Sequence, residues 1–96
     1  MSCNLPETVV REIERFAKKN KIKKVVLFGS RARGNHSERS DIDLAVSGGN
    51  AADFYYDVNE EARTLLIFDV INLDGPVSGE LRAEIEKDGV LLYEEI

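Results

Sequence analysis

Two aspartates, Asp41 and Asp43, lie two positions apart and follow a Gly-Ser pair across a short polar loop. That pair, Gly29-Ser30, ends an apolar run of the kind that forms a strand. A glycine lets the backbone approach a ligand closely, and a helical turn after it points free N–H groups at an anion. We interpret Gly29-Ser30 as a candidate phosphate-binding turn, with a plain turn as the alternative.

The two aspartates open a second apolar run, DIDLAV, in which polar and apolar residues alternate. Residues i and i+2 of a strand share a face, so Asp41 and Asp43 point into the same small volume. Two like charges that close raise each other's pKa and need compensation. A solvated edge or an arginine could supply it, and so could Mg²⁺, the usual partner of phosphate substrates. A phosphate turn and a metal site together predict chemistry on a nucleoside triphosphate.

A third aspartate, Asp69, interrupts the apolar run Leu65–Leu73. The run is typical of a buried central strand, in which a lone carboxylate is costly unless it is paired, protonated or metal-bound. If this strand lies beside the Asp41–Asp43 strand, three carboxylates converge on a two-metal site of the kind used for phosphoryl or nucleotidyl transfer. The alternative is an ion pair between Asp69 and Arg31 or Lys24.

Hydrophobic periodicity predicts the elements that position these residues. In chain order we expect a helix over Pro6–Asn20, a doubly buried strand over Lys24–Phe28, the strand Asp41–Val46, a helix over Ala51–Arg63, the strand within Leu65–Leu73, a helix from Ser78 to Gly89, and an edge strand over Val90–Tyr93. The apolar face of the second long helix would comprise Phe54 or Tyr55, Val58, Ala62 and Leu65. The order α-β-(loop)-β-α-β-α-β predicts an α/β sandwich around a central sheet.

Composition limits the class of protein. The 96 residues are enough for one domain, and a net charge of −5 disfavours nonspecific binding to nucleic acid. The single cysteine, Cys3, allows no disulfide, and no run is long enough to span a membrane, so we expect a cytoplasmic protein. His36, the one histidine, is interpreted as a solvated loop residue.

The segments GSRARG (Gly29–Gly34) and SDIDL (Ser40–Leu44), with Asp69 in a later apolar strand, resemble the DNA-polymerase-β-type nucleotidyltransferase superfamily. The resemblance is strongest to its minimal nucleotidyltransferase (MNT) branch, whose members pair with HEPN-domain proteins in prokaryotic toxin–antitoxin modules. It covers nearly the whole chain. It implies the polymerase-β-like α/β (α+β) fold, a mixed central sheet flanked by helices, in a single minimal domain over residues 1–96.

The resemblance also implies roles for individual residues. Those expected to bind the nucleotide are Gly29, Ser30, Arg31 and Ser40. Those expected to be catalytic and to bind two Mg²⁺ ions are Asp41, Asp43 and Asp69. Asp69 would also help to deprotonate an acceptor hydroxyl that attacks the α-phosphorus. The role of Arg33, phosphate contact or loop packing, is left open.

The implied function is Mg²⁺-dependent transfer of a nucleoside monophosphate, AMP from ATP, to a hydroxyl of a partner protein. The chain would then be the antitoxin of a HEPN/MNT module. Because no stretch is left to form an acceptor domain, we expect a HEPN-type helical partner, or a second copy of this chain, to complete the site. Two alternatives remain: nucleotidyl transfer to a small molecule, and a non-catalytic, nucleotide-binding antitoxin that acts by contact. The intact trio of carboxylates disfavours the second.

Overall fold

The computed structural model describes residues 5–34, 40–62 and 64–95, so Cys3 and His36 lie outside the described residues. In chain order the elements are α1 (Glu7–Lys19), β1 (Lys24–Phe28), α2 (Ser30–Arg33), β2 (Ile42–Ser47), α3 (Ala51–Glu61), β3 (Phe68–Asn72), α4 (Gly79–Asp88) and β4 (Val90–Glu94). This order confirms the predicted alternation of helices and strands. It adds one short helix, α2, at the Gly-Ser pair.

The four strands form one mixed sheet in the order β3-β2-β1-β4. β1 is antiparallel to β2 and to β4, whereas β2 and β3 run parallel. The inner strand β1 is buried after its first residue, as its continuous apolar run predicts. β4 lies at one edge, as expected from the sequence.

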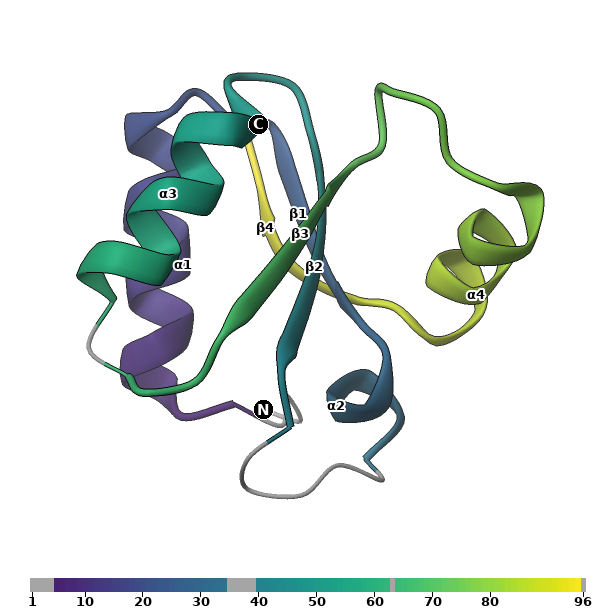
Figure 1. The fold of residues 1–96 in the computed structure, drawn as a ribbon, viewed down its shortest axis with the longest axis horizontal. Helices are drawn as coiled ribbons and strands as arrows, with labels where there is room; N and C mark the ends of the chain where they lie inside the picture. Colours follow the sequence, from purple (N-terminus) through teal and green to yellow (C-terminus); the bar gives the residue numbers. More distant parts are fainter. Residues whose placement is uncertain (1–4, 35–39, 63, 96) are drawn as a thin grey trace.

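The sheet separates two layers of helices (Figure 1). α1 and α3 cover one face and α4 lies on the other. The larger core, on the α1/α3 face, includes Phe16, Leu27, Leu44, Phe54 and Phe68. The smaller core, on the α4 face, is formed by Val26, Phe28, Ala45 and Ile85. The alternation of strand residues between the two cores follows from the two-residue period of a β-strand.

The prediction for Leu65–Leu73 as a buried central strand is wrong. β3 begins only at Phe68 and forms the sheet edge opposite β4. Leu65 is fully exposed and Ile67 is 62% exposed, so neither contributes to the core. An edge strand has one neighbour instead of two, so an apolar run by itself does not show that the strand is buried. Asp69 is consequently exposed.

The apolar face of α3 agrees with the prediction in part. Phe54 and Val58 are buried in the core, whereas Tyr55 is 48% exposed. The helix ends at Glu61, so the exposed Leu65 does not extend its face. Ala62, the residue after the helix, packs against the larger core, so the predicted face is right for Phe54, Val58 and Ala62 and wrong for Leu65.

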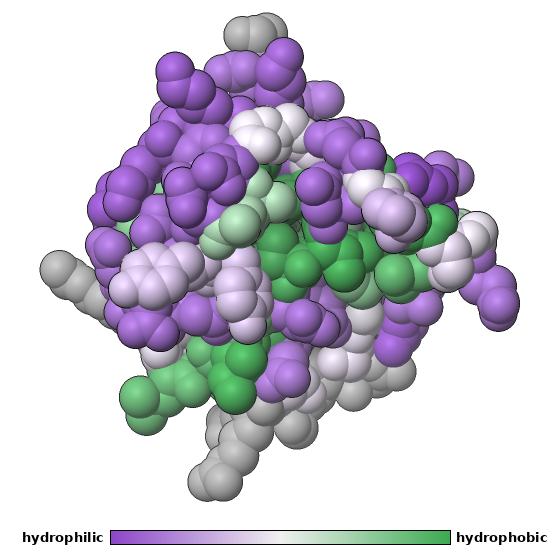
Figure 2. Space-filling model, turned by 45° about the horizontal axis from the view of Figure 1, so that its top comes forward, coloured by the Kyte–Doolittle hydropathy of each residue, from purple (hydrophilic) through white to green (hydrophobic). Residues whose placement is uncertain are grey.

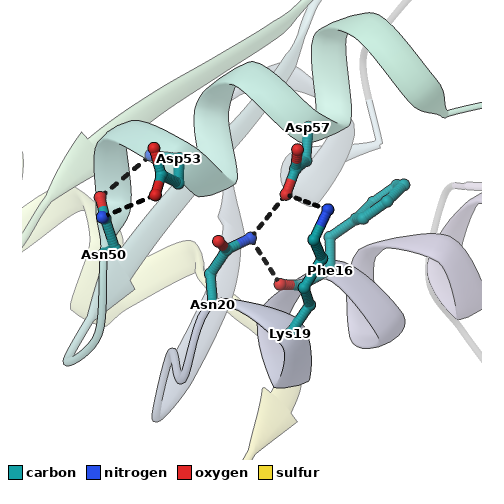
Figure 3. A network of polar contacts seen from close by, with 6 residues as sticks. All are labelled: Phe16, Lys19, Asn20, Asn50, Asp53 and Asp57. Carbon is teal, nitrogen blue, oxygen red and sulfur yellow. Dashed lines mark hydrogen bonds and ion pairs between the residues drawn. The ribbon is translucent and has the colours of Figure 1, made fainter.

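A polar clasp ties the C-terminal end of α1 to α3 (Figure 3). Asn20 Nδ2 donates to Asp57 Oδ2 at 2.9 Å and to the Phe16 carbonyl at 3.0 Å. Lys19 Nζ lies 3.3 Å from the same Asp57 oxygen. Asp57 is only 6% exposed, so these partners compensate a carboxylate that would otherwise be costly to bury. The clasp therefore fixes how the two helices cover the larger core.

The surface is largely hydrophilic, with an apolar area near the centre of the view in Figure 2. The most exposed large apolar side chains of the described residues are Tyr55, Tyr56, Leu65, Ile67 and Leu91. Within the described residues, none of the helices has the length and apolar character needed to cross a bilayer.

Candidate active site

The candidate residues gather at one end of the sheet, where β1 ends and β2 and β3 begin. Phe28, the last residue of β1, pairs with Asp43 of β2. Asp43 in turn pairs with Asp69 of β3 in the parallel ladder. Adjacent strands lie about 4.8 Å apart, so the two carboxylates start from neighbouring positions on one face. The expectation that the Asp69 strand lies beside the Asp41–Asp43 strand is confirmed.

Strand parity places this pair on the α4 face of the sheet. Asp43 is two residues before Ala45, which belongs to the smaller core, and Asp69 is two before Ile71, which packs against that core. Ile42 and Leu44 point to the larger core instead, as their alternation predicts. Asp43 is half-buried, whereas Asp41 and Asp69 are exposed. The pair therefore lies where an apolar sheet face opens to solvent.

Gly29 brings the backbone against Asp43. Its φ of +78° and ψ of −156° are readily adopted only by glycine, and a Cβ at this position would overlap the Oδ2 atom of Asp43. Ser30 follows as the first residue of α2 and is half-buried. The Gly-Ser turn and the carboxylates thus meet in one place, as a combined phosphate and metal site requires.

Arg31 links the two halves of the motif across the segment that the structure does not describe. Its side chain is almost fully buried, at 4% exposure, and its Nε donates to the Ser40 carbonyl at 3.0 Å. Ser40 immediately precedes Asp41, so this contact holds the start of the carboxylate strand against α2. A contact of either residue with a triphosphate remains a prediction.

Arg33 and Glu84 form an ion pair between α2 and α4. Arg33 Nη1 lies 3.1 Å from Glu84 Oε2, and both side chains are partly exposed. Of the two roles left open for Arg33, this contact is of the packing kind. Glu84 was not a candidate from the sequence, because an acidic residue on a partly exposed helix carries no distinguishing signal.

The charges around Asp43 shift its ionisation. Burial raises the pKa of Asp43, and the carboxylates of Asp69, Asp41 and Glu84 raise it further. The Arg33 guanidinium acts in the opposite direction and lowers it. Three carboxylates thus act on Asp43 and one arginine partly compensates them, which leaves an excess of negative charge around Asp43 that a cation would neutralise.

The donor set fits a hard divalent cation. Carboxylate oxygens are the ligands that Mg²⁺ prefers, and it is commonly held by one or two carboxylates together with substrate phosphates. Asp43 and Asp69 provide such a pair in register. Over residues 5–34, 40–62 and 64–95, no group of three or more His, Cys, Asp and Glu side chains is assembled closely enough to hold a metal by itself. The predicted convergence of three carboxylates is therefore seen for two of them.

Comparison with known proteins gives one family and several relatives. A family model described as "Polymerase beta, Nucleotidyltransferase" matches residues 11–95. The "Putative protein adenylyltransferase" of Methanocaldococcus jannaschii is 42% identical over 53 residues, which are 55% of this chain and 51% of that protein. The matched part thus spans about half the length of the curated relative.

Several solved structures share the fold, among them two toxin–antitoxin structures. A toxin–antitoxin structure with AMP-PNP superposes with a TM-score of 0.71 at 22% identity, covering 90% of this chain and 73% of the other. A Shewanella oneidensis structure of a tri-AMPylated HEPN toxin in complex with its MNT antitoxin gives a TM-score of 0.65 at 19% identity, covering 93% and 72%. At these identities the similarity establishes the polymerase-β-like fold alone.

Proposed function

Since this chain belongs to the polymerase-β nucleotidyltransferase family, we propose that it is a Mg²⁺-dependent enzyme that transfers AMP from ATP to a hydroxyl of a partner protein. Residues 1–96 would form one minimal nucleotidyltransferase domain. The observation that carries the proposal is the register of Asp43 with Asp69, beside a glycine whose backbone contacts Asp43. This arrangement supports a site for the phosphates and a cation in the same place.

Each predicted site residue has a proposed part in the reaction. Gly29 and Ser30 would bind the β- and γ-phosphates, and Arg31 and Ser40 would support this turn or add contacts. The acceptor hydroxyl loses its proton to the Asp69 carboxylate, and its oxygen attacks the α-phosphorus in line. The bond between the α-phosphorus and the bridging oxygen breaks, and pyrophosphate leaves.

The cation requirement follows from charge. Asp43 and Asp69, with Asp41 next to them, would hold two divalent ions, which would neutralise the charge that develops on the triphosphate. The accumulation of carboxylates around Asp43 supports this, because without a cation it opposes the approach of a triphosphate.

A partner protein as acceptor is supported by the relatives. The M. jannaschii relative is named as a protein adenylyltransferase, and one fold neighbour is an antitoxin in complex with an AMPylated HEPN toxin. We therefore propose a HEPN-type helical protein as partner and substrate, which makes this chain the antitoxin of such a module in the cytoplasm. A second copy of the chain could complete the site in place of that partner.

The test is transfer of label from α-labelled ATP in a lysate of the native host with Mg²⁺. Wild type is compared with Asp43→Asn, and with Asp53→Asn as a matched loss of one carboxylate from the exposed start of α3. We expect one labelled protein with wild type and with Asp53→Asn, and none with Asp43→Asn.

Two outcomes would contradict the proposal. Label that appears only in a small-molecule fraction would favour nucleotidyl transfer to a small molecule. No label with any of the four nucleotides, together with measurable binding of a partner, would leave a non-catalytic antitoxin that acts by contact.

A further inference from the structure

The backbone at the start of β3 is hydrogen-bonded on both sides. β3 is an edge strand, and among the described residues β2 is its one neighbour in the sheet. On the β2 side the N–H of Ile42 donates to the Ile67 carbonyl at 2.9 Å. On the open side the position of a second strand is taken by one side chain, Asn59 of α3. The N–H of Phe68 donates to Asn59 Oδ1 at 2.9 Å, and Asn59 Nδ2 donates to the Phe68 carbonyl at 3.1 Å.

The bond to the Phe68 carbonyl acts on the peptide group next to Asp69, and the bond from the Phe68 N–H acts on the peptide group before it. The Phe68 carbonyl and the Asp69 nitrogen belong to the same planar unit, so a bond to one restrains the other. The Phe68 side chain is 1% exposed and anchored in the larger core. Consecutive strand residues point to opposite faces, so Phe68 and Asn59 together determine where the Asp69 carboxylate starts.

Asn59 is itself held in one orientation. Its Nδ2 also donates to the Tyr55 carbonyl, one turn earlier in α3, at 3.1 Å. A side-chain amide has two N–H donors and one oxygen, and here the donors reach two carbonyls while the oxygen accepts from Phe68. Aspartate has nearly the same shape but would place an oxygen against both carbonyls. Asn59→Asp therefore replaces the two donated bonds by repulsion between oxygen atoms, which pushes the side chain away from Phe68 with little change in volume.

We propose that Asn59 is a positioning residue for Asp69, an inference that rests on the proposed function. Through the backbone of Phe68 it keeps Asp69 in register with Asp43, where the two carboxylates would share a cation. Asn59 does not itself contact the phosphates. Mutating a residue that orients a metal ligand without touching the metal typically lowers metal affinity or activity about 10- to 100-fold.

The experiment compares Mn²⁺ binding by purified wild type, Asn59→Asp and Asn20→Ala. Asn20→Ala is the control because the Asn20 amide also joins α3 to another element, through Asp57, two residues before Asn59 on the same helix. Binding is followed by paramagnetic broadening of backbone amide signals, and hydrogen exchange of the Phe68 amide is measured in parallel. We expect Asn59→Asp to bind Mn²⁺ about 10- to 100-fold more weakly and to exchange the Phe68 amide faster. Asn20→Ala should change neither the Mn²⁺ affinity nor the exchange rate of the Phe68 amide, even though it lowers stability.

Unchanged Mn²⁺ affinity in Asn59→Asp, or an equal loss in Asn20→Ala, would overturn the inference. If wild type neither transfers AMP nor binds Mn²⁺, the proposed function fails. The positioning role of Asn59 is then tested by the backbone amide signals alone. Faster exchange at Phe68 and a shifted Asp69 signal in Asn59→Asp alone would support it; the same changes in both variants would overturn it. If Asn59→Asp does not fold, Asn59→Ala replaces it in each comparison.

Discussion

Gly29 and Asp43 are in contact across the β1–β2 pair, and the contact leaves no room for a side chain on Gly29. A Cβ there would overlap Asp43 Oδ2, and the φ of +78° is one that other residues adopt only with strain. The glycine of the motif is thus required by the carboxylate as well as by the turn. This relationship joins the proposed phosphate turn and the proposed metal pair into one unit.

Gly29→Ala is expected to displace Asp43 and to strain the turn. We expect a loss of about 1–3 kcal/mol in the free energy of unfolding and of about 100-fold in AMP transfer. Gly48→Ala is the control, because Gly48 has a φ of +76° and the three atoms nearest to its Cβ would belong to the Lys23 side chain. It should lose stability and keep its activity. Equal activity losses in the two variants would mean that the Asp43 contact has no special role.

Asp43→Asn is expected to make the metal-free protein more stable at pH 7 while it abolishes transfer. Burial raises the pKa of Asp43, and Asp69, Asp41 and Glu84 add to the effect. Ionised Asp43 therefore destabilises the fold once the pH exceeds its raised pKa. Asparagine removes that cost, which for facing like charges is about 0.2–1 kcal/mol.

Urea unfolding in EDTA at pH 7 and pH 4 measures this difference. The advantage of the variant should shrink at pH 4, where wild-type Asp43 is increasingly protonated. Saturating Mg²⁺ should stabilise wild type and leave the variant unchanged. A less stable variant at pH 7 in EDTA would show that the carboxylate is compensated without a cation.

The α1–α3 clasp should make stability depend on acid pH. The hydrogen bond from Asn20 is the largest cause that lowers the pKa of Asp57, and Lys19 and Arg15 also lower it, whereas burial opposes them. This stabilisation is complete above the ordinary aspartate pKa of about 4 and is lost as the pH falls through the lower pKa of the folded state.

Asn20→Ala is therefore expected to cost about 1–3 kcal/mol at pH 7 and less near pH 2. Chemical denaturation at both values tests this. Glu7→Gln removes the exposed pair between Arg11 and Glu7 and serves as the control, with an expected cost under about 1 kcal/mol. A cost of Asn20→Ala that did not change with pH would show that the clasp does not act through the Asp57 charge.

The Arg33–Glu84 pair distinguishes the two roles of Arg33. If Arg33 packs the loop, exchanging the charges in Arg33→Glu/Glu84→Arg should restore stability and most of the ATP binding that Arg33→Glu loses. A double-mutant cycle should give a coupling of about 0.2–1 kcal/mol, since the pair is partly exposed. Fluorescence titration with a labelled ATP analogue measures the binding. A double variant that folds like wild type but binds no better than Arg33→Glu would assign Arg33 to the phosphates instead.

Several features of the protein were determined by the sequence itself. The amphipathic period of α1, the continuous apolar run of β1 and the alternation of DIDLAV each depend on residues close in the chain, and each element forms where it was expected. The helix starts are equally local, because the side chains of Asn50 and Ser78 accept from the backbone three residues later at the starts of α3 and α4. Local geometry is enough for these predictions, because strand parity and helix capping involve only near neighbours.

Only the tertiary structure decided which strand became an edge and which side chains met there. Leu65–Leu73 has the composition of a buried strand, but burial depends on how many neighbours a strand acquires, and β3 acquired one. The contacts of Glu84 with Arg33 and of Asn59 with Phe68 join different elements of the chain. No local pattern distinguishes Glu84 or Asn59 from any other polar residue of a helix. Packing brings these residues to their partners, because hydrogen bonds between elements depend on position in space and not on sequence spacing.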